Sequence, residues 1–98
     1  MGSVVISKDL KGFKDLVFSD SGAFGIRATY HFENNYGVSV IRSATSYGGN
    51  RGFWELAVLY EDDITYNTPI TSDVEGFLTE EDVTNLMHKV QALVDGIN

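Results

Sequence analysis

The stretch that decides the fold reads Gly52-Phe53-Trp54-Glu55-Leu56-Ala57-Val58-Leu59-Tyr60. Its even-numbered side chains from Trp54 to Tyr60 are all large and apolar or aromatic, which is typical of a pleated strand with a buried face. The odd-numbered Phe53, Ala57 and Leu59 are apolar as well. We therefore expect an inner strand of an antiparallel sheet that is covered on both faces.

Two further strands are expected upstream, within residues 24–33 and 36–43. Apolar and polar side chains alternate along the first of them, which indicates one dry face. Its apolar set is Phe24, Ile26, Ala28, Tyr30 and Phe32. Because paired residues of antiparallel strands share a face, the length of the loop between the two strands decides which side chains meet.

Two loop lengths can join these strands. With the two loop residues Asn34-Asn35, Val38 and Val40 would point to the polar face. With the three residues Glu33-Asn34-Asn35, Tyr30 lies opposite Val38 and Ala28 opposite Val40, so the apolar side chains share one face. We expect the three-residue register or an equivalent bulge.

Turn signals divide the rest of the sheet. Residues 46–52 contain three glycines and are expected to form the loop before the next strand. Glu61-Asp62-Asp63 should turn into a short fourth strand at residues 64–66. The single proline cannot donate to a strand ladder, so residues 67–78 are expected to form a connecting loop. The predicted sheet is a four-stranded antiparallel meander over residues 24–66.

The clearest predicted element is a helix over residues 79–95. Thr79, followed three residues later by Asp82, has the spacing of a capping box, and Gly96 is placed to end the helix. One apolar stripe runs along it, formed by Val83, Leu86, Met87, Val90, Leu93 and Val94. We expect this stripe to pack on the sheet face that carries Trp54, which gives an α+β fold.

The N-terminal segment, residues 1–22, has no decisive period. Leu10, Phe13 and Val17 have helical spacing, yet residues 16–18 fit a strand equally well. The sheet face away from the helix has an apolar centre, and we expect the N-terminal segment to cover it. The alternative is a protein-binding or homodimer surface, formed by His31, Ile41, Ala57 and Leu59.

Length and charge limit the classes of function. The 98 residues suit one domain, 1–98, with one core. The net charge of −7 is uneven, since residues 1–51 carry +2 and residues 52–98 carry −9. Such a field disfavours nucleic acid and anionic membranes as direct partners and favours basic proteins. No apolar run reaches the roughly 20 residues of a membrane-spanning helix. The absence of cysteine excludes disulfides and thiolate chemistry, and favours an intracellular protein.

No catalytic, metal or cofactor motif stands out. His31 and His88 lack metal-ligand spacing, and Glu61-Asp62-Asp63 lacks the spaced donors and glycine of a calcium loop. The glycine-rich residues 48–52 lack the Lys-Ser/Thr of a P-loop and lead into a strand. There is no nucleophile elbow. We therefore expect a protein that is not an enzyme and needs no cofactor.

Several segments resemble a group of small, uncharacterised bacteriophage-encoded accessory proteins. They are Tyr36-Gly37-Val38-Ser39-Val40-Ile41, Glu55-Leu56-Ala57-Val58-Leu59, and Thr68-Pro69-Ile70-Thr71 with Asp73-Val74 and Gly76, followed by the terminal helix. The resemblance runs from about Phe24 to Leu93 and transfers no catalytic residue. It implies an accessory protein in the cytoplasm of a bacterial host, of a kind that blocks a host enzyme or defence system by binding.

Three functions are therefore considered. The first is binding and inhibition or modulation of a host protein, such as a nucleic-acid-binding defence enzyme that meets an acidic surface imitating nucleic acid. Its expected partner-binding residues are Tyr47, Arg51, Glu61, Asp62, Asp63, Asp73, Glu75, Glu80 and Glu81. The second is binding or sequestering of a small nucleotide-like ligand, at the loop of residues 47–51 or at a dimer seam. The third is a structural role in the virion.

Overall fold

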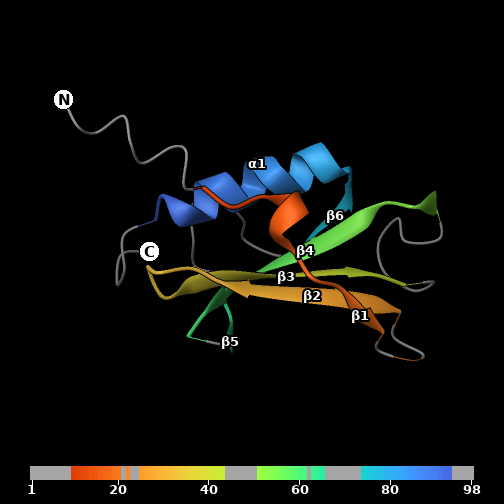
Figure 1. Cartoon of the computed structure of the whole chain (residues 1–98), viewed down its shortest axis with the longest axis horizontal. Coiled ribbons are helices and arrows are strands. Elements are labelled where there is room, and N and C mark those ends of the chain that lie inside the picture. The colour runs from red at the N-terminus through yellow and green to blue at the C-terminus, as the bar shows by residue number, and fades with distance from the viewer. Residues whose placement is uncertain are drawn as a thin grey trace.

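A helix lies across one face of an antiparallel sheet in this protein, whose structure is a computed structural model (Figure 1). The structure describes residues 10–20, 22, 25–43, 51–61, 63–65 and 74–93. The helix, α1, spans Glu80–Gln91, and the short 3-10 helix η2 spans Phe13–Asp15. The predicted α+β class is confirmed.

The described part of the sheet has six strands rather than the four expected. They are β1 (Ser19–Asp20), β2 (Ile26–His31), β3 (Tyr36–Arg42), β4 (Trp54–Tyr60), β5 (Asp63–Ile64) and β6 (Glu75–Leu78). Strands β1 to β5 follow one another in chain order as an antiparallel meander, and β6 pairs with β4. The predicted fourth strand is therefore present as β5, one residue earlier than expected, and its predicted last residue, Tyr66, lies outside the described residues.

The predicted register of the β2–β3 hairpin is confirmed. Tyr30 lies opposite Val38, and Ala28 lies opposite Val40. The backbone N–H of Phe32 donates to the carbonyl oxygen of Tyr36 at 2.8 Å, which closes the three-residue loop. As period two requires, the apolar side chains of both strands reach the same face.

The predicted connecting loop over residues 67–78 is wrong at its end, because Glu75–Leu78 forms β6. Leu78 pairs with Trp54 and Glu75 pairs with Leu56, with an extra residue on β6 between the two pairs. β5 occupies only the far end of the same β4 edge, at Leu59 and Tyr60. The open edge of β4 therefore pairs with a strand that the local sequence does not predict.

The core lies between the sheet and α1, on the Trp54 face, as predicted. The helix contributes Val83, Met87 and Val90, which are all fully buried. The sheet contributes Tyr36, Val38, Val40, Trp54, Leu56, Val58 and Leu78. Leu86 and Leu93 of the predicted stripe are partly buried against this cluster, and Val94 lies outside the described residues.

The N-terminal residues 10–18 pack on the helix side of the sheet, so the prediction that they cover the opposite face is wrong. The rings of Phe13 and Phe18 lie 5.2 and 4.7 Å from the Trp54 ring, centroid to centroid. The backbone N–H of Phe13 donates to Thr84 Oγ1 at 3.0 Å. A Cβ on buried Gly12 would lie 2.9 Å from Thr84 Cγ2, so only glycine fits this approach to α1. The segment extends the aromatic core rather than forming a second one.

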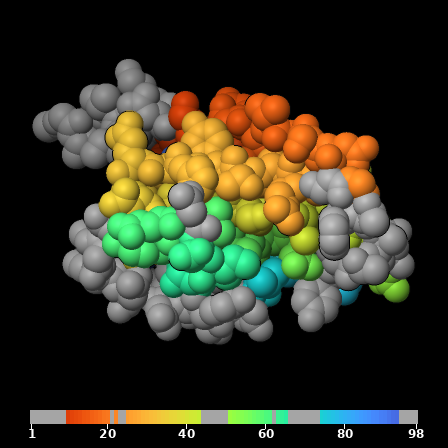
Figure 2. All heavy atoms as spheres, turned by 90° about the horizontal axis from the view of Figure 1, so that it is seen from below, coloured from red at the N-terminus to blue at the C-terminus, as the bar shows by residue number. Residues whose placement is uncertain are grey.

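The opposite face of the sheet is seen in Figure 2, where the described strands reach the surface and α1 is hidden behind them. His31 is exposed and Ile41 is half-buried on this face. Ala57 and Leu59 are only 7% and 6% exposed. Among the described residues of this face, Arg27, Thr29 and His31 of β2 and Ile64 of β5 are exposed.

The helix begins where the sequence predicts and ends earlier. The backbone N–H of Asp82 donates to Thr79 Oγ1 at 3.1 Å, and the N–H of Thr79 donates to the Asp82 carboxylate at 3.0 Å, which completes the predicted capping box. The last helical residue is Gln91 rather than residue 95. Gly96, expected to end the helix, lies outside the described residues.

Candidate functional site

The acidic residues expected to bind a partner do not form one surface. Glu80 and Glu81 begin α1, just after Leu78, which pairs with the first residue of β4, and Glu75 pairs with Leu56. Asp63 pairs with Tyr60, the last residue of β4, and Glu61 directly follows Tyr60. Trp54 and Tyr60 are six residues apart, which corresponds to about 20 Å of extended strand, whereas Leu56, the partner of Glu75, is four residues from Tyr60, or about 13 Å. Figure 1 shows β6 next to the start of α1 and β5 below the sheet, away from the helix.

The remaining predicted partner-binding residues are only partly described. Arg51 is exposed and precedes β4 by three residues, so it lies at the same end as β6. Tyr47, Asp62 and Asp73 lie outside the described residues. Arg51, Glu80 and Glu81 therefore lie beyond the Trp54 end of β4, Glu75 lies opposite Leu56 within the strand, and Glu61 and Asp63 lie at its Tyr60 end.

An exposed aromatic residue, Phe77, lies near the start of α1. We call this region the Phe77 end and define it by Phe53, Glu75, Phe77, Glu80 and Glu81. The Phe77 side chain is 57% exposed, and its ring centroid lies 6.3 Å from that of Phe53. Its φ is +57°, a conformation in which a bulky L-residue is an outlier. Such a backbone costs roughly 1–2 kcal/mol. The fold thus holds a large aromatic ring in solvent at an energetic cost.

The carboxylates at this end have a local structural role. Glu80, Glu81 and Asp82 occupy the first turn of α1, where the helix dipole favours negative charge. Hydrogen bonds from the backbone N–H and the side chain of Thr79 lower the pKa of the Asp82 carboxyl below its ordinary value of 3.8. Glu75, Glu80 and Glu81 form no ion pair with another described residue. Their negative charge therefore stays available to a partner.

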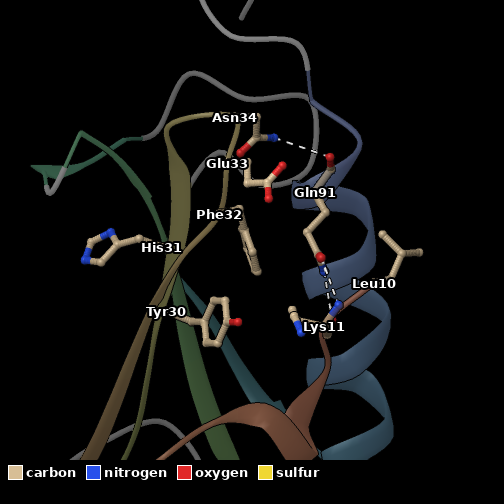
Figure 3. Close-up of a pocket in the computed structure, with 8 residues that line it drawn as sticks. All are labelled: Leu10, Lys11, Tyr30, His31, Phe32, Glu33, Asn34 and Gln91. Atoms are coloured by element: carbon tan, nitrogen blue, oxygen red, sulfur yellow. Dashed lines mark hydrogen bonds between the residues drawn. The ribbon is translucent and has the colours of Figure 1, made fainter. Parts of the chain in front are cut away.

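A second candidate region is the hairpin cleft, an open cavity of about 870 Å³ between the β2–β3 hairpin, the last turn of α1 and the start of the N-terminal segment (Figure 3). Its lining residues are Leu10, Lys11, Tyr30, His31, Phe32, Glu33, Asn34 and Gln91. In Figure 3 the His31 imidazole points away from the cleft, while Tyr30, Phe32 and Glu33 face the helix.

Two side-chain amides connect the walls of the cleft. Asn34 Nδ2 donates to the carbonyl oxygens of Val90 and Leu93, each at 2.9 Å, and its Oδ1 accepts from the N–H of Tyr36 at 3.1 Å. Gln91 Oε1 accepts from the backbone N–H of Lys11, and Gln91 Nε2 donates to the Lys11 carbonyl, both at 2.8 Å. The hairpin, the helix and the N-terminal segment are therefore held at fixed positions around the cleft.

Neither histidine belongs to a metal cluster. His31 is exposed on β2, and His88 is half-buried on α1. Within the described residues, no group of three or more His, Cys, Asp or Glu side chains is close enough to hold a metal ion. The helix that the structure describes is also too short and too polar to cross a membrane.

The three glutamates of the Phe77 end were predicted from the sequence as partner-binding residues, whereas Phe77 itself and the hairpin cleft were not. Phe77 falls in a stretch expected to be a loop, and its backbone conformation carries no sequence signal because bulky residues rarely adopt it. Asn34 was interpreted only as a turn residue, although Asn35 is the one with positive φ, at +69°. A paired Asn-Asn turn indicates a hairpin, but it cannot indicate which helix end the first amide will meet.

Comparisons with models of protein families, with curated proteins and with solved structures found no match to this chain. The resemblance to bacteriophage accessory proteins therefore stays a prediction.

Proposed function

We propose that this protein acts by binding another protein, without catalysis, and that the Phe77 end is the contact surface. In the setting that the phage resemblance implies, the partner is a host protein, and binding inhibits or modulates it. The observation that carries the proposal is Phe77, an aromatic side chain exposed to solvent on a strained backbone. Strain of this kind is concentrated at functional sites, where the surroundings enforce it.

The surroundings of Phe77 fit the anatomy of a protein interface. Buried aromatic anchors carry much of the binding energy at such surfaces, and polar residues form the rim. Phe53 lies beside Phe77 and widens the apolar centre, while Glu80 and Glu81 follow three and four residues later. The matching partner surface has an apolar pocket bordered by lysine or arginine. Enzymes that bind nucleic acid present such basic surfaces, which supports a defence enzyme as the partner.

The Phe77→Gly variant tests the apolar part of this proposal. Glycine adopts positive φ freely, so the unfolding free energy should stay level or rise by up to about 1 kcal/mol as relief of strain offsets the lost ring contact. Capture of the host partner from bacterial lysate should be lost at the same time. Ile64→Ala, which shortens another half-exposed apolar side chain at the far end of the sheet, should capture normally. Equal capture by all three proteins, or a marked loss of stability in Phe77→Gly, contradicts the proposal.

The charged part of the proposal has a separate test. The double variant Glu80→Gln, Glu81→Gln should associate more slowly with the captured partner, and its association rate should depend less on salt, because long-range attraction steers encounter. Asp63→Asn removes one charge at the other end of β4 and is the control. If the control changes the rate as much as the double variant does, the general charge of the protein is responsible rather than the Phe77 end.

A further inference from the structure

The hairpin cleft contains side chains that the fold itself does not use. Asn34 and Gln91 are engaged in joining its walls, so they shape the cleft and are not free to bind. In contrast, the Lys11 ammonium, the Tyr30 hydroxyl and the Glu33 carboxylate make no hydrogen bond or ion pair with any described residue. Three different polar groups therefore face one preformed space.

These groups have an order along the cleft. Figure 3 shows the Glu33 carboxylate near the hairpin turn, the Phe32 ring next to it, and Tyr30 below with its hydroxyl directed toward Lys11. The Tyr30 and Phe32 rings are half-buried, and their centroids lie 5.3 Å apart at an interplanar angle of 36°. The cleft thus has an aromatic floor, a hydrogen-bond acceptor at one end and a cation at the other.

We propose that the hairpin cleft binds a guanine mononucleotide. The base stacks on Phe32, and its adjacent N1–H and N2–H groups donate to the two oxygens of the Glu33 carboxylate. The phosphate meets the Lys11 ammonium and accepts a hydrogen bond from the Tyr30 hydroxyl. Stacking of bases on aromatic side chains and paired donors facing a carboxylate are general means of recognising a nucleobase.

The size and charge of the cleft agree with this class of ligand. Its volume of about 870 Å³ lies within the range of small-molecule sites. A single lysine and a single carboxylate at opposite ends of the cleft, on a chain of net charge −7, suit one phosphate group and not a polyanionic strand. The cleft lies at the C-terminal end of α1, whereas the Phe77 end lies at its start, so the ligand site is separate from the proposed protein contact.

Calorimetric titration with guanosine monophosphate, adenosine monophosphate, uridine monophosphate and unphosphorylated guanosine tests the proposal. The guanine nucleotide should bind saturably and raise the melting temperature. The affinities of the adenine and uracil nucleotides should be lower by a factor of about ten or more. Guanosine should bind with lower affinity than guanosine monophosphate, because it lacks the phosphate.

Three conservative variants assign the contacts. Lys11→Gln leaves the backbone bonds to Gln91 intact, and it should weaken binding of the nucleotide by about tenfold but not that of guanosine. Glu33→Gln should weaken both ligands and abolish the preference for guanine. Tyr30→Phe should reduce nucleotide binding by a smaller factor. Lys14→Gln, an exposed change on the same segment, is the control.

The proposal is overturned by the absence of saturable binding of any nucleotide at millimolar concentration, or by binding that Lys11→Gln and Glu33→Gln leave unchanged. Phe77→Gly separates this proposal from the protein-binding one, since that variant should bind the nucleotide normally. Binding of all four ligands with equal affinity assigns the cleft to aromatic stacking alone and also overturns guanine recognition.

Discussion

The two ends of α1 are stabilised by different parts of the chain. At the start, Thr79 and Asp82 satisfy each other's backbone N–H groups across three residues of sequence. At the end, the Asn34 amide reaches the Val90 carbonyl from a hairpin 56 residues away. Gln91 then binds the backbone of Lys11, which is 80 residues distant. The helix start is therefore stabilised within a few residues of sequence, whereas the helix end, besides its local backbone hydrogen bonds, is bonded to the hairpin and the N-terminal segment.

This difference extends to the two candidate sites. The Phe77 end joins directly to the locally capped helix start, through Leu78 and Thr79. The hairpin cleft is bounded by the same long-range hydrogen bonds that end the helix. We therefore expect the cleft to depend on the complete tertiary structure. The start of α1 should stay helical when hydrogen bonds in other parts of the protein are removed. Three changes test the comparison.

The largest effect is expected for Asn34→Ala. The change removes the donor to two helix carbonyls and the acceptor for the Tyr36 N–H, in a partly buried position. The free energy of unfolding should fall by about 2–3 kcal/mol, because these groups lose their hydrogen-bond partners. Urea denaturation measures the loss, and hydrogen exchange should rise together in the hairpin and in the last turn of α1.

Asn85→Ala is the matched control for that change, since Asn85 is exposed on α1 and has no hydrogen-bond partner among the described residues. It should be neutral or slightly stabilising through better helix propensity. A loss below about 0.5 kcal/mol in Asn34→Ala, or exchange that rises only in the hairpin, would show that the amide does not couple the two elements.

A smaller effect is expected for Thr79→Ala, at about 1 kcal/mol, which is typical for the loss of a threonine N-cap. Hydrogen exchange should rise in the first turn of α1 and stay unchanged near Gln91 and the cleft. Thr79→Ser keeps the hydroxyl acceptor and should behave nearly as the parent protein. If serine is as damaging as alanine, the threonine methyl group rather than the cap is responsible.

The smallest effect concerns pH at the same cap. Because the folded pKa of Asp82 lies below its ordinary value of 3.8, its carboxylate stabilises the fold above that pH, and the stabilisation is lost as pH falls through the lower folded pKa. The difference in unfolding free energy between the parent and Asp82→Asn should be constant near neutrality and shrink below about pH 4.

The same pH comparison can be made in the Thr79→Ala variant. With Thr79→Ala, the backbone N–H that contributes most to the lowered pKa remains, while the side-chain hydrogen bond is gone. The acid-dependent difference should then be reduced but still present. A difference that persists undiminished well below pH 3 would mean that the charge of Asp82 is not what stabilises the helix start.

Sequence patterns predicted the features that depend on neighbours in the chain. The β2–β3 register followed from the requirement that Tyr30 and Val38 share a face, and the capping box followed from the spacing of Thr79 and Asp82. The docking face of α1 also followed, because Val83, Met87 and Val90 had only one large apolar surface to meet. Each of these conclusions needed only a period or a short spacing.

The features that were missed depend on segments far apart in sequence. Residues 75–78 became a strand because β4 had a free edge there, and the alternation within those four residues is too short to predict it. The N-terminal segment joined the helix side because Phe13 and Phe18 pack on Trp54. Neither candidate site could be located from sequence, since Phe77 and the cleft both arise from these long-range pairings.

The sequence by itself determined the alternating strands, the start of the helix and the apolar face that joins them, because period and capping act over a few residues. Only the tertiary structure decided where α1 ends, which face the N-terminal segment covers and where Phe77 is exposed. The physical reason is that hydrogen bonds and ring contacts between segments more than 30 residues apart leave no periodic trace in the chain, although they fix its geometry once the core has formed.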